Sequence, residues 1–276
     1  MPEVSDPVVP SLFGRIRHRL SGGLREFRTT RDYRTFARSS AGAESAAVLA
    51  RLKGVHAGRR AFVIGNGPSL NQLDLRLLRN EVTVGCNGLF LAFDRMAGPP
   101  TYYTVEDVLV AEDRAKELTA VTGCVKVAPF DVRRFLDGGG FAFCNFVRRY
   151  AGIPRFGWEF DRASYWGGTV TFFNLQLAAY LGCDPLILIG VDHDYATNFN
   201  IKKEGKVWTS QEADRNHFDP RYFGTGYRWH DPAVDMMERA YHAAKAATDA
   251  RGVRILNATA GGKLEVFPRV SFESLF

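Results

Sequence analysis

The sequence predicts an α/β protein with a doubly wound, mostly parallel sheet and helices on both faces. Short, almost wholly apolar runs alternate with helical stretches from residue 60 onward, as in strands that are buried on both faces. Five of these runs end directly in polar or glycine residues, which is typical of parallel strands that lead into a ligand site. No repeat and no Pro/Gly/Ser linker divides residues 59–276, so we expect a single domain there.

The expected elements follow in chain order. Strands are predicted over residues 60–64, 82–86, 101–105, 124–128, 185–189 and 253–256. A leucine-bearing helical stretch follows the first strand, and a buried helix is expected over 168–182, with Gly182 past its end. The last helix, over 232–251, is expected to have Asp231 as its cap and Pro232 in its first turn. This order predicts a Rossmann-like domain.

Charge is distributed unevenly along the chain. The whole chain carries +6, but residues 1–60 hold twelve Lys and Arg against five acids, a balance of +7, which leaves −1 for the remainder. A neutral body offers no basic track, which argues against nucleic acid as a partner. We expect residues 1–58 to be a basic, partly helical arm, amphipathic over 11–27, that binds an anionic membrane surface. A solvated tail or a helix packed on the body is the alternative.

Cysteine usage and hydropathy indicate a cytoplasmic protein. The four cysteines stand in apolar surroundings without a Cys-x-x-Cys pair, which fits neither a zinc site nor a disulfide framework. No apolar run reaches the roughly 18 residues of a spanning helix, and the N-terminus lacks the apolar core of a secretory signal. If the arm binds lipid, the protein would be peripheral at the inner membrane face.

Residues 198–230 interrupt the alternation of strand and helix. They are charged and aromatic without periodicity, and a segment of this length without elements is often a functional lid. His217 lies within it, and a histidine there suits a general base for an acceptor hydroxyl. Tyr222, Tyr227 and two nearby arginines could hold phosphate oxygens without a metal.

Polar residues at the strand ends predict a ligand site at the carboxyl edge of the sheet. The turn Gly65-Asn66-Gly67-Pro68-Ser69 lets backbone approach a ligand and offers helix-start N–H groups to an anion. It matches neither the Walker nor the dinucleotide glycine motif. The other members of the set are Asn87, Glu106, Asp107, Asp192, His193, Asp194, Asn257 and Thr259. Turn formation or helix capping is the alternative for each residue taken alone.

A metal site is a second possibility at the 185–189 strand end. Asp192 and Asp194 flank His193, and two carboxylates around a histidine could hold Mg²⁺ or Mn²⁺. This interpretation fails if the two carboxylates diverge where the strand ends.

Seven blocks in order resemble one family. They are Gly65-Asn-Gly-Pro-Ser-Leu70, Gly-Cys-Asn87, Tyr102-Tyr-x-x-Glu-Asp107, Gly167-Gly-Thr-Val170 and residues 188–193, 217–223 and 257–268. Over 55–276 the chain resembles the bacterial MptE-like family, which shares a domain with Maf-type flagellin glycosyltransferases and archaeal 6-hydroxymethyl-dihydropterin pyrophosphokinase. It is more loosely similar to Campylobacter-type CMP-sialic acid sialyltransferases.

The sialyltransferase resemblance implies that the glycine turn and Asn87 hold a cytidine nucleotide, and that His217 is the general base. It implies that Tyr222 or Tyr227 takes the leaving phosphate. The full nucleotide-binding set expected from the residues and the resemblance is Gly65, Asn66, Gly67, Pro68, Ser69, Asn87, Glu106, Asp107, Gly168, Thr169, His193, Tyr227, Asn257 and Thr259. The pyrophosphokinase resemblance implies Mg²⁺ on Asp192, with Asp107 as a second ligand.

The leading interpretation is a glycosyltransferase that uses a nucleotide-activated donor, a CMP-linked acidic sugar, and a hydroxyl of a glycan, glycolipid or protein. His217, Asp192 and Tyr222 are its expected catalytic residues. The alternatives are a Mg²⁺-dependent ATP pyrophosphokinase and a non-catalytic nucleotide-sugar binding protein. The sequence leaves metal dependence and homo-oligomer formation open.

Overall fold

The computed structural model describes residues 28–148, 152–195, 201–204, 207–230 and 232–276. The amphipathic pattern predicted over 11–27, with the membrane contact expected from it, lies outside these ranges. Within them, no helix is long and apolar enough to cross a membrane.

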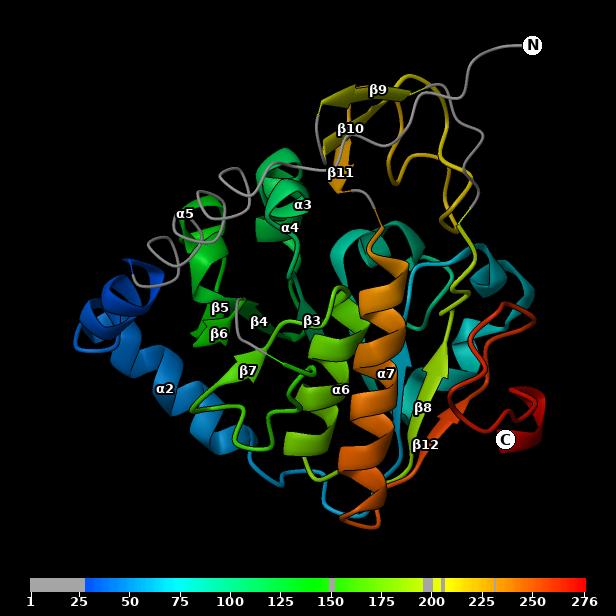
Figure 1. The fold of residues 1–276 in the computed structure, drawn as a ribbon, viewed down its shortest axis with the longest axis horizontal. Helices are drawn as coiled ribbons and strands as arrows, with labels where there is room; N and C mark the ends of the chain where they lie inside the picture. The colour runs from blue at the N-terminus through cyan, green and yellow to red at the C-terminus, as the bar shows by residue number, and fades with distance from the viewer. Residues whose placement is uncertain (1–27, 149–151, 196–200, 205–206, 231) are drawn as a thin grey trace.

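A seven-stranded sheet forms the centre of the molecule (Figure 1). The strands are β1 (Ala61–Ile64), β2 (Val82–Cys86), β3 (Tyr102–Thr104), β4 (Val125–Pro129), β5 (Phe141–Cys144), β8 (Leu186–Ile189) and β12 (Ile255–Asn257). Their order is β12-β8-β1-β2-β3-β4-β5, and every neighbouring pair is parallel. The chain runs from β1 out to β5 and returns on the other side of β1. The predicted doubly wound α/β fold is confirmed, and its reversal point lies between β1 and β8.

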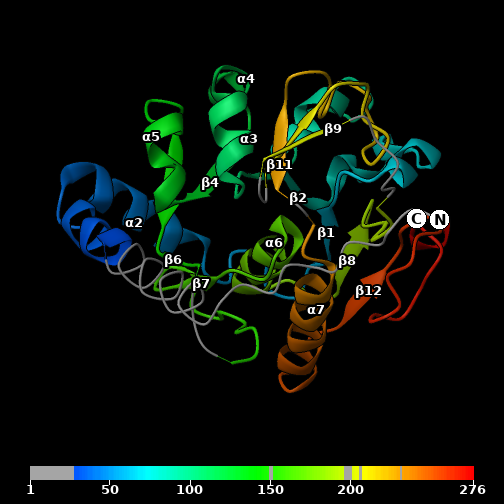
Figure 2. The ribbon, with the colours of Figure 1, turned by 45° about the horizontal axis from the view of Figure 1, so that its top comes forward.

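Helices cover both faces of this sheet (Figure 2). One face carries α2 (Ser40–Leu52), α6 (Val170–Tyr180) and α7 (Val234–Asp249), whose apolar residues share a core with the sheet. The other carries η1 (Pro68–Gln72), η2 (Leu75–Asn80), η3 (Asn87–Ala92), α3 (Val108–Asp113), α4 (Ala115–Ala120), η4 (Phe130–Val132) and α5 (Arg133–Leu136). A short η5 (Glu273–Leu275) ends the chain.

Alternation along the strands explains the two cores. Successive strand side chains point to opposite faces, so Ala61 and Val63 join the α6 side while Phe62 and Ile64 join the α3 side. All four are fully buried. A strand of this kind appears in the sequence as a continuous apolar run, which is why β1 could be predicted.

Residues 40–52, which the sequence analysis assigns to the arm, belong to the body. Leu49 and Leu52 of α2 are buried in the core beneath the sheet. The hydroxyl of Ser45 accepts a hydrogen bond from the N–H of Phe143 on the edge strand β5, at 3.2 Å. Residues 28–36 are also helical. The fold therefore begins well before residue 58.

Several element predictions need correction. The predicted helical stretch after β1 consists of two 3-10 helices, η1 and η2, with extended Leu73 and Asp74 between them. Helix α7 begins after Ala233 without a side-chain cap, and the predicted cap Asp231 lies outside the described ranges. Strand β5 and the short pair β6 (Phe146–Val147) and β7 (Ser164–Tyr165) were not predicted, because runs this short carry no clear period.

The predicted lid, residues 198–230, is not devoid of elements. Its described part contains β9 (Ile201–Glu204), β10 (Val207–Ser210) and β11 (Arg228–His230), which form an antiparallel sheet in the order β11-β10-β9. Trp208 pairs with Trp229 across β10 and β11, with ring centroids 6.3 Å apart. The expectation of a segment without secondary structure is therefore wrong for this part of the chain.

Candidate functional site

A cavity of about 900 Å³ lies at the carboxyl edge of the central sheet, within the size range of small-ligand sites. The turns after β1, β2, β3 and β8, the starts of α6 and α7, and the lid contribute to its lining. The predicted residues that it brings together are Gly65, Asn66, Gly67, Asn87, Glu106, Asp107, Gly168, Thr169, Asp192, His193, Asp194, His217 and Tyr222. Thr169 also caps α6, where its side chain accepts from the N–H of Thr171.

The glycine turn after β1 is tied to the turn after β8. The Ser69 N–H and hydroxyl donate to the two carboxylate oxygens of Asp192, at 3.1 and 2.7 Å. A Cβ atom on Gly67 would stand 1.8 Å from Asp192 Oδ2, so this approach requires glycine. Burial raises the pKa of Asp192, while the hydrogen bonds from Ser69 oppose the rise. The Ser69 N–H, expected to be available to an anion, is thus used by Asp192.

Two buried asparagines, Asn66 and Asn87, line the cavity. They are only 8% and 6% exposed, and within the described residues neither Oδ1 atom has a hydrogen-bond partner. The Asn66 amide nitrogen donates to the carbonyl of Cys86 at 3.4 Å. Asn87 has a φ of 50°, a left-handed conformation that asparagine tolerates. Because buried polar atoms without partners are rare, each of these two oxygens calls for a hydrogen-bond donor that the described residues do not supply.

His217 is held by an acid that the sequence analysis missed. Its Nδ1 atom lies 2.7 Å from Oδ2 of Asp214. Burial would raise the pKa of Asp214, but the hydrogen bond and charge of His217, with the N–H groups of Asn216 and Phe223, lower it below its usual value. Asp214 therefore remains ionised and fixes a proton on Nδ1, which leaves Nε2 free to accept one. The only sequence signal was the Asp-x-x-His spacing, which is common.

Tyr222 is the surface on which His217 rests. The two rings are parallel within 2° and their centroids are 3.9 Å apart. Tyr222 is almost fully buried, and burial raises its pKa, so the hydroxyl stays protonated. A Cβ on Gly88 would stand 2.3 Å from the Tyr222 ring, so glycine is needed there. Tyr227, the other predicted phosphate ligand, is absent from the cavity lining and packs under Arg114 instead.

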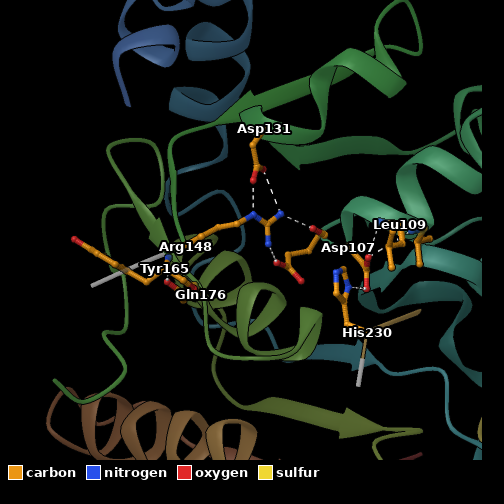
Figure 3. A network of polar contacts seen from close by, with 9 residues as sticks. Asp107, Leu109, Asp131, Arg148, Tyr165, Gln176 and His230 are labelled. Carbon is orange, nitrogen blue, oxygen red and sulfur yellow. Dashed lines mark hydrogen bonds and ion pairs between the residues drawn. The ribbon is translucent and has the colours of Figure 1, made fainter. Parts of the chain in front are cut away.

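A polar network occupies one wall of the cavity (Figure 3). Arg148 donates to the side chain of Glu106 at 2.5 Å, to its carbonyl at 2.8 Å, and to Asp131. Burial raises the pKa of Glu106, and the charge of Arg148 partly offsets this. Glu106 thus directs its carboxylate to Arg148. Neither Arg148 nor Asp131 carried a sequence signal.

Asp107 joins the lid to the body. One of its oxygens caps α3 by accepting from the N–H of Leu109 at 2.7 Å, and the other lies 3.4 Å from Nδ1 of His230 on β11 (Figure 3). Burial would raise the pKa of Asp107, but His230 and the N–H of Leu109 bring it below its usual value. The same contact raises the pKa of His230.

Asn257 and Thr259 do not line the cavity. The Asn257 side chain accepts from the N–H of Thr259 at 3.0 Å and donates to the carbonyl of Leu264 at 2.9 Å. The Thr259 hydroxyl accepts from the N–H of Val191 at 3.1 Å. These bonds use the polar groups expected to meet the nucleotide, so both residues support the turn after β8 instead. Pro68 and Ser69 lie within the glycine turn but outside the lining.

His193 adds a third unsatisfied group at the cavity. It has a φ of 52°, and its buried Nδ1 atom has no hydrogen-bond partner in the part of the chain that the structure describes. Its ring meets the edge of Tyr241 at 5.7 Å between centroids. Burial lowers the pKa of His193, so the neutral imidazole faces the cavity at neutral pH.

The carboxylates present do not fit the Mg²⁺ site implied by the pyrophosphokinase resemblance. Both oxygens of Asp192 accept from Ser69, Asp107 caps α3, and Asp194 pairs with Lys263 at 2.8 Å. In the part of the chain that the structure describes, no group of three or more His, Cys, Asp or Glu is arranged to hold a metal ion.

No family model and no curated protein matches the sequence, so the MptE-like resemblance stays a prediction. The sialyltransferase CstII from Campylobacter jejuni with cytidine-5'-monophosphate is similar in structure, at 12% identity over 78% of this chain and 86% of that chain, with a TM-score of 0.45. The same protein with CMP-3FNeuAc is similar at 10% identity over 77% of this chain and 86% of that chain, with a TM-score of 0.42. A mammalian sialyltransferase with Gal-beta-1-3GalNAc-ortho-nitrophenol is similar at 9% identity over 86% of each chain, with a TM-score of 0.38.

Proposed function

We propose that the protein is a glycosyltransferase that moves a sugar from a nucleotide-activated donor to a hydroxyl acceptor. The observation that carries the proposal is the His217–Asp214 pair at a cavity lined by two buried asparagines whose oxygens lack donors among the described residues. The cavity lies outside the carboxyl ends of β1 and β8, at the reversal of a doubly wound sheet, where such folds bind ligands.

The arrangement supports transfer by a general base. His217 Nε2 would take the proton of the acceptor hydroxyl as its oxygen attacks the anomeric carbon. The bond from that carbon to the phosphate oxygen breaks, and the nucleotide leaves with the electron pair. Asp214 stabilises the resulting imidazolium, which later releases its proton to solvent.

A cytidine nucleotide is the donor carrier that we propose. The oxygens of Asn66 and Asn87 need hydrogen-bond donors, and the exocyclic amino group of cytosine or a ribose hydroxyl supplies them. Support for an acidic sugar is weaker. Arg148 is the only basic Lys or Arg side chain among the described lining residues, and its guanidinium already pairs with Glu106 and Asp131. A sugar carboxylate would depend on backbone N–H groups and His193, so neutral and acidic CMP-linked donors should be compared directly.

The test is donor turnover followed by chromatography of the released nucleotide. We expect His217→Ala to lower kcat by about 10²–10⁴-fold while nucleotide affinity stays within about twofold of wild type. The matched control is His242→Ala, because His242 is an exposed histidine of α7 away from the cavity lining. Turnover of His217→Ala at the wild-type rate would refute the base.

The same assay separates the alternatives. AMP formation from ATP that requires Mg²⁺ would replace the proposal with a pyrophosphokinase. Nucleotide binding without turnover above the buffer rate, across neutral and acidic donors, would indicate a binding protein.

A further inference from the structure

Arg114 is a buried arginine at the junction of α3 and α4. It is 4% exposed, and its Nη2 atom donates to the carbonyl oxygens of Arg221 and Tyr222, at 2.5 and 2.6 Å. Its guanidinium carbon lies 4.0 Å from the centroid of the Tyr227 ring. Its ion-pair partner Glu117 is 3.4 Å away and 39% exposed. Carbonyl dipoles and ring faces, rather than a buried carboxylate, thus surround most of this charge.

Stability alone does not account for such a residue. Burying a guanidinium is costly unless it is fully paired, and replacing a buried charge by an apolar side chain of similar volume is often neutral or stabilising. Among the residues that the structure describes, the Nε atom of Arg114 has no hydrogen-bond partner, so the pairing is incomplete. Both carbonyl contacts of Arg114 and its nearest ring contact lie on one segment of the lid, residues 221–227, while Glu117 and the ring of Phe90 contact it from the body.

That segment supplies the ring that stacks on His217 and an N–H that holds Asp214. The ring of Tyr222 stacks on the imidazole, and the next N–H, of Phe223, donates to Asp214 Oδ2 at 3.0 Å. The same Asp214 oxygen lies 2.7 Å from His217 Nδ1. By fixing the carbonyls of 221 and 222, Arg114 fixes the backbone on which the stacking platform and the orienting carboxylate depend.

We propose that Arg114 is a positioning residue that sets the orientation of the His217 imidazole without touching the substrate. As a role in catalysis this rests on the proposed function, since it presumes that His217 is the base. As a statement about the orientation of His217 it can be tested on the protein alone.

The experiment compares Arg114→Ala and Arg114→Lys with Arg228→Met. Arg228 is the matched control because it also joins the lid to α3, by donating to Asp113 at 3.0 Å, while its described side-chain hydrogen bonds go to Asp113 and Glu112 and it does not line the cavity. Steady-state kinetics give kcat and KM for the donor. A ¹H–¹⁵N spectrum of the imidazoles reports the His217 Nδ1–H, assigned by its loss in His217→Ala.

We expect Arg114→Ala to lower kcat by about tenfold or more with the donor KM within about twofold. The Nδ1–H signal should shift or broaden, and millimolar guanidinium should restore both readouts. Arg228→Met should leave both at wild-type values. A folded Arg114→Ala protein with wild-type kcat and an unchanged signal would overturn the proposal.

Two other results are also informative: an Arg114→Ala protein that does not fold, and a wild-type protein without transfer activity. If Arg114→Ala does not fold, Arg114→Lys decides, because an ammonium reaches a carbonyl but cannot reproduce the planar contact with Tyr227. An intermediate kcat with a shifted Nδ1–H signal supports the proposal, and wild-type values for both overturn it. If wild type shows no transfer, the proposed function fails, yet a signal altered in Arg114→Ala alone still supports the positioning role.

Discussion

The substitution Arg148→Met tests how much the polar network in the cavity wall contributes to the stability of the protein. It removes the guanidinium that hydrogen bonds to Glu106 and Asp131, and leaves the Glu106 carboxyl buried without a cation. Breaking a buried pair by removing one partner costs about 3–5 kcal/mol. Because the Arg148 side chain is 25% exposed, we expect the lower end, about 3 kcal/mol, at pH 7.

The loss should depend on pH in a definite direction. Burial already raises the pKa of Glu106, and loss of Arg148 raises it further. A carboxyl whose folded pKa lies above its unfolded value binds its proton more tightly when folded, so stability falls as the pH rises between those two values. The difference between variant and wild type should therefore grow as the pH rises from the folded pKa of Glu106 in the wild type to its higher folded pKa in the variant, by up to about 1.4 kcal/mol per pH unit.

Urea unfolding at pH 5, 6 and 7, followed by circular dichroism, measures this difference. The double variant Arg148→Met/Glu106→Gln is the control, because a neutral amide should recover part of the stability and flatten the pH dependence. An equal loss in Arg148→Met at pH 5 and pH 7 would refute the reasoning.

Three further predictions concern the site. Asp214→Asn should lower kcat by about 10²–10⁴-fold with little change in donor affinity, because the amide no longer fixes the Nδ1 proton, and steady-state kinetics would show an unchanged kcat if this is wrong. Gly67→Ala should weaken nucleotide binding by about tenfold or more in calorimetry, since its Cβ displaces Asp192 from Ser69. Gly224→Ala, whose nearest neighbour would be 3.6 Å away, is its control, and equal affinities would contradict the prediction. His230→Gln should destabilise the protein at pH 6 more than at pH 8 in urea unfolding. Asp107 raises the pKa of His230, so that contribution is present below about pH 6.5 and is lost as the pH rises through the folded pKa. If the substitution lowers the free energy of unfolding equally at both pH values, the charge of His230 beside Asp107 does not stabilise the protein.

The sheet and the location of the site could be predicted because both depend on local pattern. Continuous apolar runs identified β1, β2 and β8, and the residues directly after parallel strands must meet at one edge. The direction in which a side chain points after a strand, however, depends on contacts that the local sequence pattern does not specify. Asn66 follows β1 and Asn257 is the last residue of β12, but only Asn66 lines the cavity, because Leu264 and Thr259 take up the amide of Asn257.

The long-range contacts could not be predicted. Arg148 meets Glu106 across 42 residues, and Arg114 meets the carbonyl of Tyr222 across 108. Such pairs depend on how strands and lid pack in space, and no spacing in a single sequence encodes them. The β9–β11 sheet was missed for a related reason, since strands this short in a charged segment carry little hydrophobic periodicity.

The central claim is that the cavity binds a cytidine nucleotide for sugar transfer. Calorimetric titration of wild type with CMP, CTP, ATP and GTP, each with and without EDTA, tests it most directly. We predict one site that binds the cytidine nucleotides, is unaffected by EDTA and is weakened in Asn66→Ala, where an unsatisfied acceptor is lost. Mg²⁺-dependent binding of ATP, with no binding of CMP or CTP, would contradict the account.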